Sequence, residues 1–313
     1  MRGMVVGAGL GTRLRPLTNL CPKPALPVRG IPLVGYQLAL LARHGVTEVI
    51  VNTHHLSDHL IEAARGSCPD GVELHFSVED ELLGTGGGIR RVAAFLRESD
   101  PSIIIGGDQV LDLDLTAFIA KHRSRGDAAT LQLLDDPRAA AFGPIGVDAE
   151  GSVRRVANRF DLGGEVRSGL YTWVNAIAPR AFDWLPDREV FSHLDHWLIP
   201  RVEAGERDVR GEVATRDTCV WVPVGTPAEY LEANLTPRPL SYLDVEAVAE
   251  QRGVRFTGDV VVGAGATIAR GASLRRTVIW DGEQVPALPA ADGVFAGGAF
   301  HTCLPPRIRG GRL

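Results

Sequence analysis

Residues 3–24 read GMVVGAGLGTRLRPLTNLCPKP, and this stretch decides the fold. An apolar segment typical of a buried strand leads into a glycine-rich loop that contains Arg13, and the stretch ends in the string Pro-Lys-Pro. Gly7, Gly9 and Gly11 can adopt positive φ angles and let backbone N–H groups approach a ligand with no Cβ in the way. A strand followed by such a cluster of amides predicts an anion site suited to phosphate.

The local charge supports an anion site. The first acidic residue is Glu48, and before it the chain carries only cations: Arg2, Arg13, Arg15, Lys23, Arg29 and Arg43. A polyphosphate would therefore meet positive potential there, although the net charge of the chain is −5. Lysine occurs only at Lys23 and Lys121, so Lys23 indicates a place where a compact ammonium group is needed between phosphate oxygens.

Other readings of the glycine-rich loop are possible. Alternating glycines also occur in tight strand-to-helix turns that bind nothing. A Walker loop would close with Gly-Lys-Ser or Gly-Lys-Thr, and a dinucleotide-binding fold would place an acidic residue about 20 positions further on. The chain has neither feature, so these two phosphate loops are excluded.

Strand-like and helix-like segments alternate through the first half of the chain. This order predicts an α/β fold with a Rossmann-like, doubly wound and mostly parallel sheet. The expected strands cover 47–53, 72–78 and 102–107 in addition to the first one, and the expected helices cover 32–45, 57–66 and 87–99. Ser57 is expected to cap the second helix. Since ligands bind at the carboxyl ends of such strands, the glycine loop, residues 53–55, residues 83–88 and Asp108 should meet at one edge.

The second half of the chain has a different pattern. Short strands punctuated by Gly and Pro over 128–177 predict an antiparallel extension, and helices are expected at 179–185, 192–204 and 226–236. Pro237 and Pro239 mark a boundary between domain 1–239 and a segment 240–313, whose tail PPRIRGGRL should be solvated. Glycines about every six residues in 260–280 indicate a short left-handed β-helix-like segment, with an ordinary glycine-rich meander as the alternative. An uncovered coil end would favour a homo-oligomer.

Five motifs follow one another in an order that identifies a family. The signature G-x-G-T-R-L-x-P-L-T with a later P-K-P matches Gly9 to Thr18 and Pro22 to Pro24, and further segments match at 51–60, 79–91, 106–115 and 221–234. The chain resembles the sugar-1-phosphate nucleotidylyltransferases. It is most similar to the bacterial branch of mannose-1-phosphate guanylyltransferase-like and N-acetylmuramate-1-phosphate uridylyltransferase-like enzymes. The resemblance implies a GT-A-like core and Mg²⁺-dependent nucleotidyl transfer from an NTP to a sugar 1-phosphate.

The resemblance also implies roles for single residues. Arg13 would grip the β and γ phosphates, Lys23 would bridge the α-phosphate and the acceptor phosphate, and Asp108 would hold Mg²⁺. Asp108 could instead be a turn or helix-cap residue. The implied nucleotide-binding set is Ala8, Gly9, Gly11, Thr12, Arg13, Glu79, Gly84, Thr85, Gly86 and Gly107. The implied substrate-binding set is Gly143, Thr172 and Asn175. The paired histidines His54 and His55 fit a packing or surface role better than a metal site.

Two positions depart from the family pattern. Pro223 stands where relatives carry the aspartate that forms the second carboxylate on magnesium, and Trp173 stands where related enzymes have a glycine facing the sugar. The usual sugar-phosphate lysine is also missing, with Arg154, Arg155 and Arg159 as possible substitutes and Asp217 as a possible displaced acid.

Two functions therefore stay open. The protein is either a working transferase, with a sugar or another phosphate such as phosphocholine as acceptor, or a non-catalytic paralogue that binds a nucleotide or nucleotide-sugar and regulates a partner.

Composition excludes several other classes of protein. Only 6% of residues are aromatic and no basic stripe is present, which argues against a nucleic-acid partner. No apolar run approaches the length of a membrane span, and no leader precedes the first strand, so a cytoplasmic protein without a membrane partner is expected. The four cysteines are widely spaced without a C-x-x-C pair, which predicts neither a zinc site nor a redox dithiol.

Overall fold

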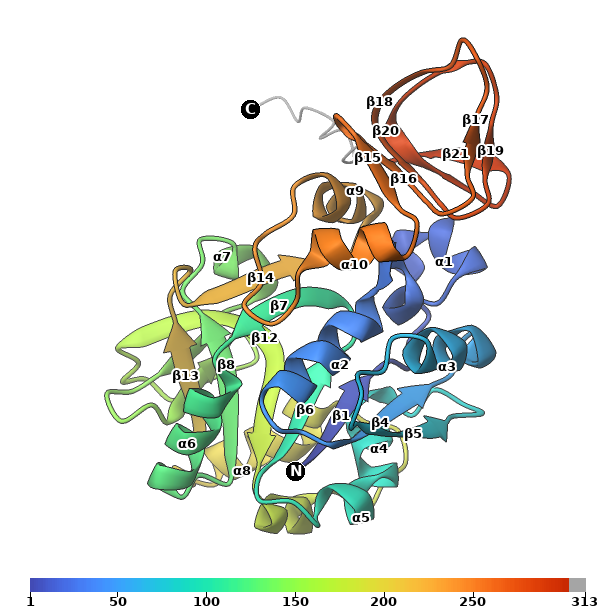
Figure 1. Cartoon of the computed structure of the whole chain (residues 1–313). Helices are drawn as coiled ribbons and strands as arrows, with labels where there is room; N and C mark the ends of the chain where they lie inside the picture. Colours follow the sequence, from blue (N-terminus) through green and yellow to red (C-terminus); the bar gives the residue numbers. More distant parts are fainter. Residues whose placement is uncertain (304–313) are drawn as a thin grey trace, which may run out of the picture.

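A computed structural model describes residues 1–303, and the predicted solvated tail lies outside the described residues. Its centre is a twisted sheet whose parallel part has the order β6-β1-β4-β5 (Figure 1). These strands are β1 (Arg2–Val6), β4 (Glu48–Thr53), β5 (Glu73–Val78) and β6 (Ser102–Gly106). The mostly parallel sheet expected from the alternating pattern is confirmed.

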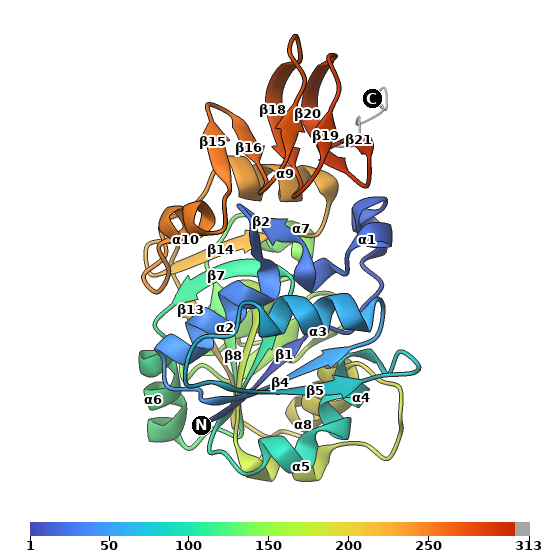
Figure 2. The same ribbon diagram turned by 45° about the vertical axis from the view of Figure 1, so that its right-hand side comes forward.

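Helices cover both faces of this sheet (Figure 2). On one side lie α2 (Leu33–Arg43) and α3 (Ser57–Arg65), and on the other lie α4 (Gly84–Arg91) and α5 (Ala93–Leu96). Successive strand residues point to opposite faces, so Val5 packs with Leu38 of α2 whereas Met4 packs with Ile89 of α4. The apolar runs of the strands are therefore buried on both sides, as a doubly wound fold requires.

The antiparallel extension expected over 128–177 is present. Its long strand β12 (Arg167–Ile177) pairs antiparallel with β6 and with β8 (Ala129–Leu134), and β13 (Val209–Ala214) adds to β8 in parallel. A meander of β9 (Ile145–Val147), β10 (Val153–Val156) and β11 (Phe160–Asp161) continues the sheet. Beside it, β7 (Gln109–Leu113) and β14 (Cys219–Pro223) form a separate antiparallel pair.

The remaining helices largely follow the expected positions. The segment 179–185 forms a 3-10 helix (Pro179–Trp184), and 192–204 forms a π-turn (Leu194–Leu198) followed by α8 (Ile199–Glu203). The others are α6 (Leu115–Arg125), α7 (Ala139–Phe142), α9 (Pro227–Leu235) and α10 (Val245–Gln251). The predicted Ser57 cap is wrong: Leu56 is the N-cap at φ 51°, and Ser57 Oγ donates to the His54 carbonyl, 2.8 Å away, instead of accepting a helix N–H.

Residues 7–32, between β1 and α2, form a loop that carries four of the early cations and that we call the cation loop. It is built from the short elements η1 (Thr12–Leu14), α1 (Leu17–Leu20), η2 (Lys23–Ala25), β2 (Pro27–Val28) and β3 (Ile31–Pro32). Three of its four glycines, Gly7, Gly9 and Gly11, precede η1, whereas its prolines all stand later, from residue 16 to residue 32. The loop thus begins with backbone that can approach a ligand closely and continues with backbone whose φ angles proline restricts.

Parallel strands stack in the C-terminal segment, where Figure 1 shows the chain running round a triangular outline. Rungs β16 (Val260–Val262), β18 (Ser273–Ile279) and β20 (Pro289–Ala296) pair in parallel, as do β17 (Thr267–Ile268) and β19 (Gln284–Val285). The antiparallel strands β15 (Arg255–Thr257) and β21 (Ala299–Thr302) flank the rungs. One apolar cluster joins this segment to the cation loop, since Val254 and Val278 pack in the same core as Leu14 and Leu26.

Within residues 1–303, the helices are all too short or too polar to cross a bilayer.

Candidate active site

Two adjoining cavities lie at the carboxyl ends of the parallel strands. The larger has a volume of about 590 Å³ and the smaller about 180 Å³. Among the described residues, four line both cavities: Lys23, Thr85, Asp108 and Trp173. The glycine loop, the 83–88 loop and Asp108 therefore meet at one edge, as predicted from the sequence.

The fourth predicted motif, residues 53–55, lies behind the cavities and lines neither of them. His54 Nδ1 lies 2.9 Å from the Glu79 carbonyl, and His55 Nε2 lies 2.9 Å from the Thr18 carbonyl. Both histidines thus hold neighbouring loops, which agrees with the packing role favoured for them. Thr53 is fully buried at the end of β4.

The glycine loop forms the wall of the smaller cavity. Backbone of Gly7, Ala8, Gly9 and Gly11 lines it. Gly11 has φ 57°, the left-handed region that favours glycine, and is the N-cap residue of η1. A Cβ on Gly9 would meet no atom within 4 Å, so the space beside this backbone is open to a ligand. Thr12 follows at the start of η1 and lines neither cavity.

A buried polar bridge joins the glycine loop to the 83–88 loop. The Gly7 N–H donates to Asn52 Oδ1 at 2.8 Å, and Asn52 Nδ2 donates to Glu79 Oε1 at 2.7 Å. Glu79, only 2% exposed, also accepts the Leu83 N–H at 3.2 Å. Glu79 is thus a loop contact and does not line the cavities. Sequence reasoning missed Asn52, whose only signal is an amide at the end of an apolar strand.

Most glycines of the 83–88 loop serve packing. The Gly86 N–H donates to the Phe191 carbonyl at 2.8 Å, and a Cβ on Gly87 would lie 2.0 Å from the Glu189 carbonyl oxygen. Residues 189–191 therefore pass directly over the start of α4, which only glycine allows. Gly84 and Thr85 line the larger cavity.

Gly107 likewise has a structural role. Its N–H donates to the Val6 carbonyl at 3.0 Å, and the residue is buried between β6 and β7. Of the implied nucleotide-binding set, Gly86 and Gly107 therefore have amides that already have protein partners.

Lys23 and Asp108 form the centre of the cleft. Lys23 Nζ lies 2.6 Å from Asp108 Oδ2, with 12% of the lysine side chain and 43% of the aspartate side chain exposed. Lys23 starts η2 between two prolines, whose fixed φ angles restrict its backbone. Asp108 follows β6 closely along the chain. Lys23 occupies Oδ2, and none of the residues up to 303 donates a hydrogen bond to Oδ1, which can therefore accept a ligand.

Arg13 lies at the edge of the larger cavity. It belongs to η1, and its guanidinium stands next to Gly225, where a Cβ would be 3.5 Å from Arg13 Nη2. Glu229 lines the same wall and accepts the Gly225 N–H at 2.8 Å. The cleft thus holds two cations, Arg13 and Lys23, on the side of the glycine loop.

Aromatic rings line much of the larger cavity: Phe142, Tyr171, Trp173, Phe191, His193 and Trp221. Trp173 has φ 62° at a register shift in β12, a strained conformation for a tryptophan. Its indole packs against His193, with ring centroids 4.4 Å apart. Since Trp173 lines both cavities, its side chain is part of the wall between them.

A hydrogen-bonded chain lies beneath Trp173. His193 Nδ1 is 2.9 Å from Thr85 Oγ1 and its Nε2 is 3.0 Å from the Tyr171 hydroxyl, which donates to Asn175 Oδ1 at 2.7 Å. Because the Tyr171 hydroxyl donates its proton to Asn175, it can only accept a hydrogen bond from His193. His193 Nε2 therefore carries the imidazole proton, and Thr85 donates to Nδ1. Burial lowers the pKa of His193 to about 3, which keeps the ring neutral. Sequence reasoning missed His193, which is far from the motifs along the chain.

The implied substrate-binding residues differ in their positions. Gly143, with φ 86°, lines the larger cavity. Asn175 lies below Tyr171 and donates to the Ile104 carbonyl at 3.3 Å, while the buried Thr172 donates to the Gln132 carbonyl at 3.0 Å. Asn175 and Thr172 line neither cavity, so their side chains support the wall instead of facing a ligand.

Pro223 does lie at the cleft. In the pairing of β14 with β7 it stands opposite Gln109, next to Asp108, and it lines the larger cavity. Asp217 is not brought to this site: it lies in a separate hollow with Asp112 and Asp114, toward the opposite end of the same strand pair. The expectation of Asp217 as a displaced acid is therefore wrong.

Only Arg159 among the three candidate arginines lines the cleft. It forms an ion pair with Asp195, which lines the same cavity. Burial acts to raise the pKa of Asp195, but the hydrogen bond with Ser192 and the charge of Arg159 outweigh it, so the pKa stays below its ordinary value. Arg155 is instead paired with Glu165 at 2.5 Å, and Arg154 donates to the Gly163 carbonyl at 2.9 Å.

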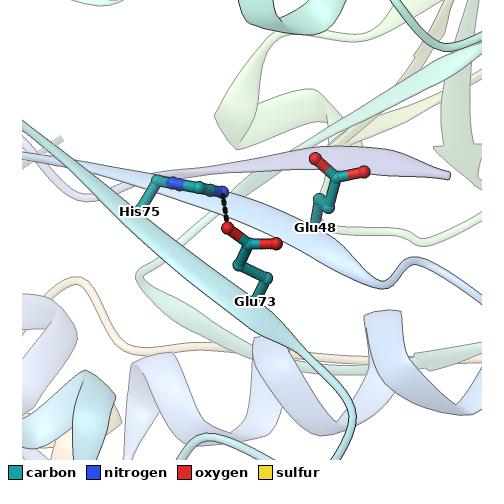
Figure 3. Close-up of side chains that lie close together, drawn as sticks. All are labelled: Glu48, Glu73 and His75. Carbon is teal, nitrogen blue, oxygen red and sulfur yellow. Dashed lines mark ion pairs between the residues drawn. The ribbon is translucent and has the colours of Figure 1, made fainter.

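A second group of ionisable side chains lies away from the cleft. Figure 3 shows Glu48, Glu73 and His75 at the amino ends of β4 and β5. His75 Nε2 is 3.4 Å from Glu73 Oε1, and Arg2 Nε is 3.0 Å from Glu48 Oε2. Since Arg2 already neutralises Glu48, we interpret this group as a surface ion-pair cluster.

Comparisons with known proteins find both related sequences and a related fold. The family model described as nucleotidyl transferase matches residues 2–238. The mannose-1-phosphate guanylyltransferase of Mycobacterium tuberculosis (strain ATCC 25618 / H37Rv) is 32% identical over 304 residues, which cover 91% of this chain and 81% of the relative. The N-acetylmuramate alpha-1-phosphate uridylyltransferase of Neisseria meningitidis serogroup B is 32% identical over 239 residues, which cover 74% and 96%.

Among solved structures, HddC from Yersinia pseudotuberculosis has a similar fold. The TM-score is 0.61 at 23% sequence identity, and the match covers 74% of this chain and 97% of HddC.

Proposed function

The chain belongs to the nucleotidyl transferase family, among relatives that are sugar-1-phosphate nucleotidyltransferases, and on this basis we propose that it transfers a nucleotidyl group from an NTP to a sugar 1-phosphate. In this reaction a phosphate oxygen of the acceptor attacks the α-phosphorus of the NTP. The bond between the α-phosphorus and the bridging oxygen breaks, and pyrophosphate leaves. The products are an NDP-sugar and pyrophosphate.

The observation that supports this proposal most is the position of Lys23 and Asp108. Both line the small cavity, walled by the glycine loop, and the large cavity, walled by aromatic rings. A donor held in one cavity and an acceptor held in the other would meet at these two side chains. Lys23 would reduce the repulsion between the two phosphates, and Arg13 would stabilise charge on the departing pyrophosphate.

We assign a Mg²⁺ site to Asp108. Its carboxylate lines both cavities, and among residues 1–303 only Lys23 donates to it, at Oδ2. Carboxylate and phosphate oxygens are the ligands that Mg²⁺ prefers. When bound, the ion would neutralise phosphate charge and make the α-phosphorus more electrophilic. Pro223 supplies no side-chain oxygen next to this carboxylate, so the affinity for Mg²⁺ should be low.

The acceptor side is assigned to the larger cavity. Arg13 and Lys23 line this cavity on the side of the glycine loop, and Arg159 is a further cation in its lining. An acceptor phosphate would compete with Asp195 for the Arg159 guanidinium. Trp173 and His193 would form the floor against which the body of the acceptor packs.

We further assign the C-terminal rungs to a short left-handed β-helix. The in-register parallel pairs β16-β18-β20 and β17-β19 support this assignment, because a β-helix stacks successive coils in this way.

A second function is favoured by Pro223 and Trp173 together. Pro223 leaves the position beside Asp108 without the carboxylate that the family pattern has there. Trp173 fills part of the wall between the cavities. A protein with these two changes could bind a nucleotide or nucleotide-sugar without turnover and act on a partner.

A turnover assay separates the two functions. The protein is mixed with Mg²⁺, each NTP and a panel of sugar 1-phosphates plus phosphocholine, and pyrophosphate is measured. The transferase predicts pyrophosphate and an NDP product in equal amounts for at least one pair. Asp108→Asn should abolish this turnover, while Asp112→Asn, which removes the same charge outside the cleft, should not. Nucleotide binding without turnover for any pair would favour the regulatory function.

A further inference from the structure

We propose that Arg29 is a positioning residue for Lys23, and that through it the C-terminal segment, residues 240–303, holds the cleft in its working geometry. The inference rests on the proposed function for the role of Lys23. Arg29 lines neither cavity, so it would act through the backbone that carries Lys23.

The backbone connection between the two residues is short. Lys23 starts η2, which runs into the hairpin of β2 and β3. Arg29 and Gly30 form the turn of this hairpin with φ 52° and φ 75°. Two successive left-handed residues are typical of a type I′ turn, a conformation that an arginine adopts only when other contacts hold it. The position of the hairpin therefore depends on what Arg29 contacts.

Arg29 is buried, with 7% of its surface exposed, and it contacts three elements outside the cation loop. Its N–H donates to Asn234 Oδ1 at 2.7 Å, and its Nη1 donates to the Asn234 carbonyl of α9 at 3.0 Å. Its Nη2 donates to Glu246 of α10 at 3.2 Å. The guanidinium carbon lies 3.8 Å from the ring centroid of Phe256 in β15. A buried charge that has one carboxylate, one carbonyl and one ring as partners has few alternative positions.

Other contacts between the same segments support this anchor. Tyr230 Oη donates to the Pro27 carbonyl at 2.6 Å and accepts from Trp280 Nε1 at 2.9 Å. A Cβ on Gly30 would lie 2.3 Å from Val254 Cγ2, so the C-terminal segment touches the hairpin turn directly. The hairpin is thus held by α9 on one side and by the C-terminal segment on the other.

This arrangement predicts a specific effect on Lys23. If Arg29 loses its stacking and ion-pair partners, η2 can move and Lys23 can leave Asp108. A misplaced group near the reacting atoms can cost about 100-fold in rate. The loss should fall on kcat more than on the KM for NTP, because Lys23 would act on the phosphates as they react.

The reactivity of Lys23 toward an acylating reagent tests the proposal without an activity assay. The chain has only two lysines, so a mild amine-acylating reagent followed by peptide mass spectrometry reports Lys23 against the internal reference Lys121. The variants are Arg29→Met and, in case that protein fails to fold, Phe256→Leu. Arg2→Met is the matched control, since Arg2 also pairs with glutamates and stacks on a ring, Phe95, but lies at the start of β1, away from the hairpin (Figure 2).

We expect Lys23 acylation relative to Lys121 to rise by about fivefold or more in Arg29→Met and in Phe256→Leu, since local opening exposes the amine. In Arg2→Met it should remain at the wild-type ratio. Folded Arg29→Met and Phe256→Leu proteins with the wild-type ratio would overturn the proposal. A raised ratio in a protein without turnover would support this inference while contradicting the transferase function.

Discussion

Mild acid should destabilise the protein through His193, and the size of the effect follows from its burial. The imidazole is buried between Thr85 and Tyr171, and burial lowers its pKa from 6.5 to about 3. The unfolded chain takes up a proton on this histidine below pH 6.5, whereas the folded protein does not until near pH 3. Stability is therefore lost as pH falls through this window.

The magnitude can be worked out for pH 5.0. This pH lies 1.5 units below the ordinary pKa of 6.5, and each unit corresponds to about 1.4 kcal/mol, so His193 should cost about 2 kcal/mol of unfolding free energy. His193→Gln removes the titration and keeps an amide that can donate and accept. The loss of stability between pH 7.5 and 5.0 should be smaller in this variant by the same amount.

Urea denaturation at the two pH values measures the difference. Other titrating groups, including the buried His122 with its pKa lowered to about 4 by burial, are common to both proteins and cancel. His59→Gln provides the control for the substitution itself, because it makes the same change at an exposed histidine. An equal loss of stability in wild type and His193→Gln would refute the reasoning that His193 is buried and neutral.

Three further changes test the cleft and the buried bridge that supports its loops. Pro223→Asp should place a carboxylate beside Asp108 and lower the Mg²⁺ concentration at half-maximal turnover, and an unchanged midpoint would contradict the Mg²⁺ assignment. Trp173→Gly should keep the fold, because φ 62° suits glycine, and should raise kcat/KM for bulky acceptors relative to small ones; the same acceptor ranking as wild type would count against Trp173 as a wall. Asn52→Leu should leave buried Glu79 without its amide partner and cost about 3 kcal/mol in urea denaturation, whereas a loss near zero would contradict the bridge.

The sheet and its edge could be predicted from the sequence because both depend on local patterns. Apolar runs such as 47–53 and 102–107, which alternate with helix-like segments, predict the strands. The residues that follow these strands lie at one edge of a parallel sheet. Asp108 comes from such a position and Lys23 from the loop that follows β1, and the structure brings their side chains within 2.6 Å. The parallel order of the strands needed no information from distant residues.

Long-range packing could not be predicted in the same way. The family resemblance implies nucleotide binding for Gly84 and Gly86, yet the close contacts of Gly84, Gly86 and Gly87 are with residues 189–191, which come much later in the chain. The periodicity of a helix or strand does not indicate which segment from elsewhere in the chain packs over it. For the same reason Asn52 and His193 were missed. The Asp217 expectation failed because Asp217 precedes β14 at the end where Cys219 pairs with Leu113, whereas the cleft lies at the other end, where Pro223 pairs with Gln109.

The central claim is that the cationic glycine loop binds the phosphates of a nucleoside triphosphate. Isothermal titration of ATP, GTP, CTP, UTP and dTTP into the protein with Mg²⁺ tests it most directly, with Arg13→Gln as the comparison. We predict saturable heat for at least one nucleotide and an affinity about tenfold lower in Arg13→Gln, the loss expected for one charge-assisted phosphate contact. No saturable heat for any of these nucleotides, or equal affinity in both proteins, would contradict it.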